Sequence, residues 1–368
     1  MSRRKKQKKQ QSTSGPKTAR SERSRTHGDE LLIDALDAMT SADRRVLCTS
    51  LGYGQFAEAL ARHFPETRVV CNFLDLYQTN VAQRSLAAGE TDNLSFTCTA
   101  DFPDEQFDVV ALPFRKGDSS ELTREMIQSG YQALRIGGRL MVSFDNIKDH
   151  WLHELLRSLF PKVTRRPSAE GVVYIATKRT PLKKVRDYFC EITFRDGDRL
   201  MRAVSRPGVF SHRKLDNGAR ALIKSMQVED GFRVLDLGCG SGAVALAAAA
   251  RAENVRVHAI DSAPRALQCT RMGAELNELA GITTQLDADG NCDDPKTFDL
   301  VLGNPPYFSN YRIASIFVRA GIRALKPGGT LAIVTKTYDW FGQTMSDYQD
   351  DVVVHEVGNY FVVTGTQR

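Results

Sequence analysis

Short apolar runs alternate with helix-forming segments along the second half of the chain. Runs of about five apolar residues are typical of strands buried on both faces of a parallel sheet. The segments between them are rich in helix formers, so the alternation predicts a doubly wound α/β sheet. The predicted strands are Arg233–Leu237, Val255–Ile260, Thr283–Leu286, Phe298–Leu302 and Thr330–Thr335; the predicted helices are Ala243–Arg251, Pro264–Leu279 and Ile313–Leu325; Val352–Val354 and Tyr360–Val363 are predicted to form a closing hairpin.

The first half of the chain repeats this order in diverged form. Three blocks lie 188 to 191 residues before their counterparts, and this nearly constant offset indicates an internal duplication. Proline and basic residues interrupt the pattern near Lys178–Arg186, which predicts a linker there. We therefore expect two tandem domains, residues 28–180 and 181–368. The matching blocks are Val46–Gly54 with Val234–Gly242, Phe107–Ala111 with Phe298–Leu302, and Ala133–Leu140 with Ala324–Leu331.

A glycine-rich loop, Asp236–Gly242, follows the first strand of the second domain. Glycines at such a turn allow positive φ and close approach of a ligand, although a tight structural turn has the same pattern. Asp261 ends the next strand, where a carboxylate accepts hydrogen bonds from ribose hydroxyls. Asp289 follows the third strand and is a candidate for an adenine edge, with Asp287 as its rival. A ligand with a ribose, an adenine and a cationic tail suits these acids better than a pyrophosphate, which they would repel.

The tetrapeptide Asn304-Pro305-Pro306-Tyr307 follows the fourth strand, at the edge where doubly wound sheets bind ligands. The prolines restrict φ and stiffen the turn. The Asn304 side-chain oxygen and a backbone carbonyl can accept hydrogen bonds from an exocyclic amino group, and Tyr307 can stack on a planar base. The alternative is a stiff turn with a buried aromatic. The first domain has Leu112-Pro113-Phe114 here, with Cys48 and Ser50 in place of Asp236 and Gly238, so we expect it to be a scaffold or substrate platform.

Composition limits the classes of protein to which the chain can belong. With 42% hydrophobic and 26% charged residues and no apolar run long enough to span a bilayer, it has the composition of a soluble globular protein. The seven cysteines are scattered without a C-x-x-C pair, which argues against a disulfide framework or a zinc ribbon. We expect a cytoplasmic protein without a metal.

The net charge of +6 comes from the N-terminus. Residues 1–27 hold ten basic residues and one acid, and the rest of the chain carries a net charge of −3. We predict a disordered basic tail, which either keeps the protein in solution or forms an electrostatic arm for RNA phosphates. Further basic residues form either an RNA track or charged strand edges: Arg165, Arg166, Arg195, Arg199, Arg202, Arg206, Arg213 and Lys214.

The motifs D-x-G-x-G-x-G and N-P-P-[YF] together resemble those of class I methyltransferases that depend on S-adenosyl-L-methionine. More closely, the chain resembles the tandem-domain guanine-N2 methyltransferases of bacterial ribosomal RNA, which pair a degenerate first domain with a catalytic second one. Those enzymes also have a segment like Pro207–Ser211 followed by Leu215-Asp216. The resemblance is strong over residues 200–368 and only architectural over 28–180.

The resemblance implies two Rossmann-like domains, each a mostly parallel seven-stranded sheet with a C-terminal antiparallel hairpin. It implies transfer of a methyl group to the N2 of a guanine in ribosomal RNA or a ribosomal subunit. The implied catalytic residues are Asn304, Pro305 and Tyr307, and the implied cofactor-binding residues are Asp236, Gly238, Gly240, Gly242, Asp261, Asp289 and Asn304.

Two other functions fit the motifs. The N-P-P-Y tetrapeptide would also suit methylation of adenine N6 or of a protein glutamine amide, although the duplicated first domain favours ribosomal RNA. A non-catalytic RNA-binding scaffold is the second alternative. The presence of Asp236, the three loop glycines and Asn304 argues against it. The sequence does not predict the oligomeric state or the nucleotide modified.

Overall fold

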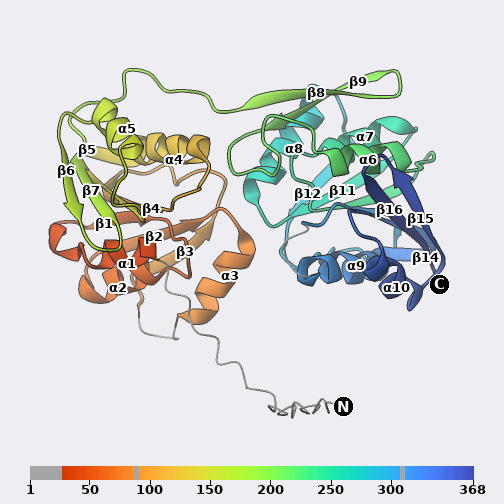
Figure 1. Ribbon diagram of the computed structural model, residues 1–368, viewed down its shortest axis with the longest axis horizontal. Coiled ribbons are helices and arrows are strands. Elements are labelled where there is room, and N and C mark those ends of the chain that lie inside the picture. The colour runs from red at the N-terminus through yellow and green to blue at the C-terminus, as the bar shows by residue number, and fades with distance from the viewer. Residues whose placement is uncertain (1–26, 87–90, 307–310) are drawn as a thin grey trace, which may run out of the picture.

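The computed structural model describes residues 27–86, 91–306 and 311–368, and within them two seven-stranded sheets lie side by side (Figure 1). The first has the strand order β3-β2-β1-β4-β5-β7-β6 and the second β12-β11-β10-β13-β14-β16-β15. The two orders are the same, which confirms two tandem domains of one architecture. In each sheet the first five strands pair in parallel. The last two form an antiparallel hairpin that also joins the fifth strand in antiparallel fashion, as predicted.

Helix α1 of the first domain already includes His27, the one residue of the predicted tail that the structure describes, so the prediction of disorder was wrong at this residue. Its strands are β1 (Arg45–Cys48), β2 (Arg68–Phe73), β3 (Leu94–Cys98), β4 (Phe107–Phe114), β5 (Leu134–Phe144), β6 (Val163–Pro167) and β7 (Val172–Thr177); its helices are α1 (His27–Ile33), α2 (Gln55–His63), α3 (Leu76–Ser85), α4 (Ser120–Ala133) and α5 (Trp151–Leu159).

A hairpin, β8 (Cys190–Asp196) and β9 (Arg199–Ser205), follows the first domain and packs its apolar face on the core of the second. We propose residues 28–180 and 181–368 as the two domains, because β7 ends before this hairpin begins. The second sheet contains β10 (Arg233–Leu237), β11 (Arg256–Asp261), β12 (Ile282–Leu286), β13 (Phe298–Gly303), β14 (Leu325–Thr335), β15 (Gln349–Val357) and β16 (Tyr360–Gln367); its helices are α6 (Asn217–Ser225), α7 (Ala243–Arg251), α8 (Pro264–Leu276), α9 (Arg312–Ala324) and α10 (Asp339–Ser346).

Several predicted boundaries in the second domain differ from the observed ones, including those of the closing hairpin, and tertiary contacts explain two of the differences. The helix predicted to reach Leu279 ends at Leu276, where Asn277 exchanges hydrogen bonds with the backbone of Arg202 in β9. The strand predicted to begin at Thr330 begins at Leu325, because the turn before it joins β14 through a shift in register against β13. In the part of the chain that is described, no helix has both the length and the apolarity needed to cross a bilayer.

A buried network of charges joins the two domains. Glu125 of α4 accepts hydrogen bonds from Arg206, which follows β9, and from Arg265 of α8, at 2.6 Å for Arg265. All three side chains are buried, and Arg265 also donates to the carbonyls of Ala100 and Pro207. The possible role of Arg206 in an RNA track was therefore wrong, because its guanidinium is enclosed between the domains. Figure 1 shows α4 and α8 on the facing sides of the two sheets.

Replacing Glu125 tests whether the buried network contributes more to the free energy of unfolding than an exposed ion pair does. In Glu125→Ala, two buried guanidiniums lose their shared carboxylate, and we expect the free energy of unfolding to fall by about 3–5 kcal/mol. Urea unfolding followed by circular dichroism measures this change. The exposed pair of Arg44 and Glu66 provides the control, and Glu66→Ala should change the free energy by less than about 1 kcal/mol. Equal effects of the two variants would contradict a structural role for the network.

Candidate active site

The parallel register brings the predicted site residues to one edge of the second sheet. Asp236 pairs with Leu302, and Leu237 pairs with Gly303, so the glycine loop and the Asn304 turn leave neighbouring strands at the same level. On the other side of β10, Leu237 pairs with Ile260, the residue before Asp261. The carboxyl ends of β10, β11 and β13 therefore bring together residues that lie up to 68 positions apart.

The three glycines of the loop have different reasons for being glycine. All have positive φ, at 67°, 55° and 77° for Gly238, Gly240 and Gly242. A Cβ on Gly238 would lie 2.7 Å from the Phe317 ring, and one on Gly242 would lie 2.8 Å from the Thr270 hydroxyl. Neighbouring side chains therefore leave no room for a side chain at these two positions. Beside Gly240, no atom of the described residues, apart from those of its two chain neighbours, lies within 4 Å of the Cβ position. A ligand can therefore approach the backbone at Gly240, which is what a cofactor cradle requires.

Asp261 is bound to the glycine loop from the next strand. One carboxylate oxygen accepts from the Gly240 amide at 2.9 Å, and the other accepts from the Ala263 amide at 2.9 Å. Each oxygen has a second lone pair, so a carboxylate held in this way can still accept from a ribose hydroxyl. Burial raises the pKa of Asp261 above its usual value. A cationic ligand nearby would favour its charged form.

Asp236 lies beneath the loop. Its side chain is buried, and the carboxylate accepts a hydrogen bond of 3.1 Å from the Ala245 amide in the first turn of α7. Burial raises the pKa of Asp236 to about 8. The residue therefore holds the loop against the helix, close to where the resemblance places the methionine part of the cofactor.

Asn304 is oriented by a residue whose role the sequence did not predict. Its side-chain nitrogen donates to Asp216 at 2.9 Å, and Asp216 also accepts from the Ala219 amide as the N-cap of α6. A carboxylate only accepts, so the amide nitrogen is the end of Asn304 that faces it, and the amide oxygen faces the other way. In the sequence, Asp216 belongs only to a segment that resembles one in the family. An aspartate at the start of a predicted helix is typical of an N-cap, and this is the pattern that could have identified it.

The remaining residues at this edge, which include Cys239 of the glycine loop, divide into three groups. Pro305 is buried beside Asn304, whereas Tyr307 lies outside the described residues. Asp287 accepts from the amides of Asp289 and Asn291, so its carboxylate shapes the turn after β12, and Asp289 is the exposed acid there. Cys239 lies buried inside the loop, and burial raises the pKa of its thiol well above the usual value, which disfavours a nucleophilic thiolate.

The corresponding loop of the first domain is filled by its own side chains. The Ser50 hydroxyl accepts from the amides of Gly52 and Gly54, each at 3.0 Å, and donates to buried Asp29 of α1 at 2.7 Å. Pro113, in the position of Asn304, continues strand β4 and has no amide side chain. Backbone donors that a cofactor would need are thus already paired, which supports the predicted scaffold role.

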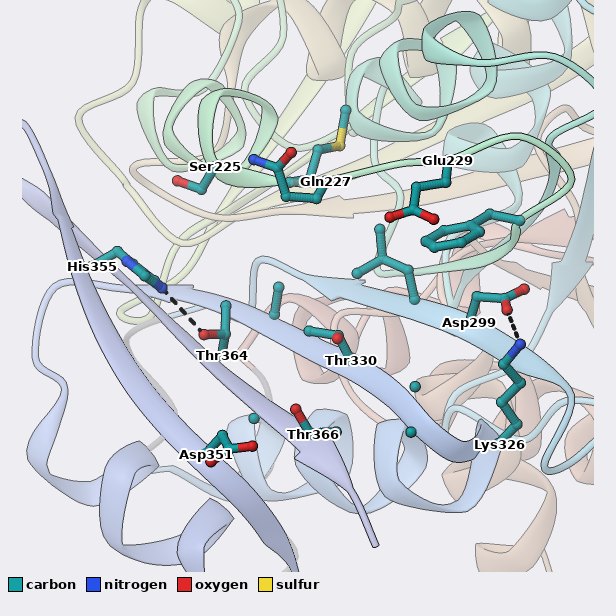
Figure 2. A pocket seen from close by; sticks show the side chains of 17 residues that line it. Ser225, Gln227, Glu229, Asp299, Lys326, Thr330, Asp351, His355, Thr364 and Thr366 are labelled. Atoms are coloured by element: carbon teal, nitrogen blue, oxygen red, sulfur yellow. Dashed lines mark hydrogen bonds and ion pairs between the residues drawn. The ribbon is translucent and has the colours of Figure 1, made fainter.

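A cavity of about 600 Å³ lies at the opposite edge of the second sheet (Figure 2). It is lined near the amino ends of β13 and β14 by Asp299 and Lys326, which form an ion pair, and farther along by His355 and Thr364. The glycine loop and Asn304 follow the carboxyl ends of their strands, so this cavity is separate from the candidate active site. Among the described residues, no group of three or more His, Cys, Asp or Glu side chains is placed to hold a metal ion.

Known proteins resemble both halves of the chain. The family model described as "Methyltransferase small domain" matches residues 20–172 and 201–364. A protein of Pseudomonas putida named "Ribosomal RNA small subunit methyltransferase C" is 30% identical over 167 residues, 44% of this chain and 49% of that protein. A protein of the same name from Shewanella pealeana is 26% identical over 271 residues, 71% of this chain and 77% of that protein. The matched part of the chain thus spans about half the length of the Pseudomonas relatives and more of the Shewanella one.

A solved structure extends the likeness to the whole fold. It is described as a Thermus thermophilus 16S rRNA N2 G1207 methyltransferase in complex with AdoMet and guanosine. Its TM-score is 0.74 at 20% identity, and the superposition covers 94% of this chain and 93% of that one. The two-domain α/β architecture is therefore confirmed.

The raised pKa of Asp236 predicts a pH dependence of stability. The folded chain keeps the Asp236 proton up to about pH 8, whereas an unfolded aspartate loses it near about pH 4. Between these values the folded state binds more protons, so this group makes the free energy of unfolding fall as pH rises. Denaturant unfolding between about pH 5 and about pH 8 should show a flatter profile for Asp236→Asn. The exposed Asp289→Asn should keep the wild-type slope, and a wild-type slope in Asp236→Asn would contradict the prediction.

Proposed function

Because the chain belongs to the methyltransferase small domain family, we propose that it methylates the exocyclic N2 of a guanine in ribosomal RNA. S-adenosyl-L-methionine is the proposed methyl donor. The observation that carries the proposal is the pairing of an open glycine loop with an oriented asparagine at the ends of adjacent strands. The names of the relatives support RNA of the small subunit as the substrate.

The glycine loop and the strand-end acids are the proposed cofactor site. Gly240 allows the cofactor to lie against the backbone, and Asp261 would hold the ribose hydroxyls. Asp236 supports the loop beside the methionine part, and the exposed Asp289 is the proposed partner of the adenine. When bound, S-adenosyl-L-methionine would supply the methyl group: its S–C bond would break as the N2–C bond forms, and a proton of the amino group would pass to solvent.

Asn304 and Pro305 are proposed to hold the amino group that is methylated. The Asn304 oxygen, turned away from Asp216, and the Pro305 carbonyl would each accept one N–H of the guanine N2. Two such bonds fix the plane of the amino group and direct its lone pair toward the methyl donor. Alignment of this kind can lower a barrier by about 7–11 kcal/mol. Tyr307 is proposed to stack on the base after the base has been turned out of its helix.

The first domain and the basic tail are proposed to serve the RNA. Ser50 and Asp29 fill the loop that corresponds to the cofactor site, which leaves the first domain a platform. The basic tail is proposed as an arm for phosphates, whose deletion should reduce the salt dependence of RNA binding. Nucleoside mass spectrometry of ribosomal RNA from cells with and without the gene would distinguish guanine N2 from adenine N6. Radiolabel found only in protein would instead support a glutamine amide as the acceptor.

Asn304→Ala tests the catalytic role. Loss of the oriented amide should lower kcat by about 10²–10³-fold, by analogy with the loss of one oriented hydrogen bond at other active sites. Transfer of a radiolabelled methyl group to ribosomal RNA measures kcat, and calorimetry should show cofactor binding close to that of the wild type.

Asp216→Ala is the companion variant, because it keeps the amide but removes the acceptor that orients it. We expect a smaller loss of kcat than in Asn304→Ala. Wild-type turnover in Asn304→Ala would exclude the proposed role.

Asp261→Ala tests the cofactor site. A hydrogen bond to a charged group contributes about 1.5–3 kcal/mol, so the Kd for the cofactor should rise about 10–150-fold. Isothermal calorimetry measures this change without any RNA. The exposed Glu253→Ala is the matched control and should bind as the wild type does. Equal Kd values for the two variants would remove Asp261 from the site.

A further inference from the structure

Exposed aromatic side chains surround the edge that holds Asn304, and they come from both domains. Tyr77 of α3, Tyr311 before α9 and Tyr338 before α10 are 44%, 41% and 40% exposed. Figure 1 shows α3 at the side of the first domain that faces the second. An exposed tyrosine presents a flat apolar ring with a polar hydroxyl, which suits a partner with flat surfaces.

Contacts with the cofactor edge fix the position of Tyr77. Asp75, the N-cap of α3, accepts from the Ser262 hydroxyl at 2.7 Å, and the Leu76 amide donates to the Ser262 carbonyl at 2.8 Å. Ser262 directly follows Asp261. The first turn of α3 is therefore bound beside the proposed ribose site, and Tyr77 is carried there with it.

Arg312, which follows Asn304 along the chain, contacts Tyr77 of the first domain. Its guanidinium lies 5.5 Å from the centre of the Tyr77 ring, across the junction of the two domains. Arg312 is the first residue of α9 and is exposed, so its other face remains accessible to an anion. A cation over an aromatic ring is a combination that stacks on bases and contacts phosphates.

Tyr311 has a backbone conformation that is costly for a tyrosine. Its φ of 61° is left-handed, and such strain persists only where contacts enforce it, often at functional sites. The ring stacks on Trp340 with centroids 4.8 Å apart, and the hydroxyl lies 3.4 Å from that of Thr337. The next residue, Tyr338, packs edge-on against Phe361. Stacked contacts thus continue from Tyr311 to the segment after β14.

The segment after β14 adds a second cation at the same edge. Gly303 pairs with Ile333, so Lys336 and Tyr338 leave β14 beside the strand that ends at Asn304. Lys336 lies 5.7 Å from the centre of the Tyr360 ring and is exposed. Asp339 is the exposed acid of this segment.

We propose that the aromatic rim, defined as Tyr77, Tyr311, Arg312, Lys336 and Tyr338, binds the unpaired nucleotides that flank the target guanine. This inference rests on the proposed function. Rings that stack on any base, alternating with cations that contact phosphates, are the means by which proteins hold single-stranded nucleic acid. A duplex keeps its bases stacked inside and offers such rings little. The rim also gives the first domain a direct part in substrate binding, through Tyr77.

Binding of a short, fluorescently labelled single-stranded RNA to the full chain tests the rim without any methylation. Tyr77→Ala and Tyr338→Ala should each raise the Kd about 10-fold, because each removes one stacking ring. Tyr77→Phe keeps the ring and should bind within about 2-fold of the wild type. Tyr348 is 53% exposed and lies outside the rim, so Tyr348→Ala is the matched control. The wild type should prefer the single strand to the same sequence in a duplex.

The rim is overturned if Tyr77→Ala and Tyr338→Ala bind the single strand as Tyr348→Ala does, or if the wild type prefers the duplex. Labelled-methyl transfer by the wild type is measured in parallel. If the two rim variants lose binding while the wild type transfers no methyl group to RNA, the RNA-binding rim is supported and the proposed methylation fails. If transfer occurs but binding is unaffected in both variants, the rim fails and the proposed function stands.

Discussion

The parallel register of β10 with its two neighbours is the constraint on which the candidate site depends. Parallel strands end at one edge of a sheet, so the residues that follow them meet even when they are far apart in sequence. Here Asp236 pairs with Ala259 and Leu302, so Asp261 and Asn304 both lie two residues beyond it, toward the carboxyl edge of the sheet. A shift of one residue in β13 would move Asn304 away from Asp216 and turn the side chains of that strand to the opposite face. Backbone pairing thus sets where these residues lie, independently of their side chains.

The first domain shows that the strand register alone does not make a candidate active site. Both sheets have the same strand order, and both bring a loop and a strand end together. In the first domain, Ser50 and Asp29 pair the loop amides, and Pro113 stands where Asn304 stands in the second. In the second domain, open space remains beside Gly240, and Asp216 orients an amide. A few side chains therefore separate a scaffold from a candidate active site on one fold.

The domain junction links these two halves physically. Glu125 of the first domain accepts hydrogen bonds from Arg206 and Arg265 of the second domain inside a buried network. Removing one partner of such a buried pair is strongly destabilising, because it leaves an uncompensated charge inside the protein. With the junction fixed, the Asp75–Ser262 hydrogen bond holds α3 at the cofactor edge, and Tyr77 reaches the proposed RNA path. In the proposed arrangement, the first domain would therefore form one wall of the site in the second.

Sequence by itself determined the α/β class, the duplication, the glycine loop and the Asn304 turn, because these depend on local patterns of apolar residues, glycine and proline. It also identified Ser50 and Pro113 as departures from the second copy. It did not reveal that Asp216 orients Asn304, that Arg206 is enclosed between domains, or that Tyr77 lies beside Ser262. These contacts join residues 88, 81 and more than 180 positions apart, for Asn304–Asp216, Arg206–Glu125 and Asp75–Ser262. Only the packing of sheets and domains brings such residues together, since no local pattern carries information about a distant partner.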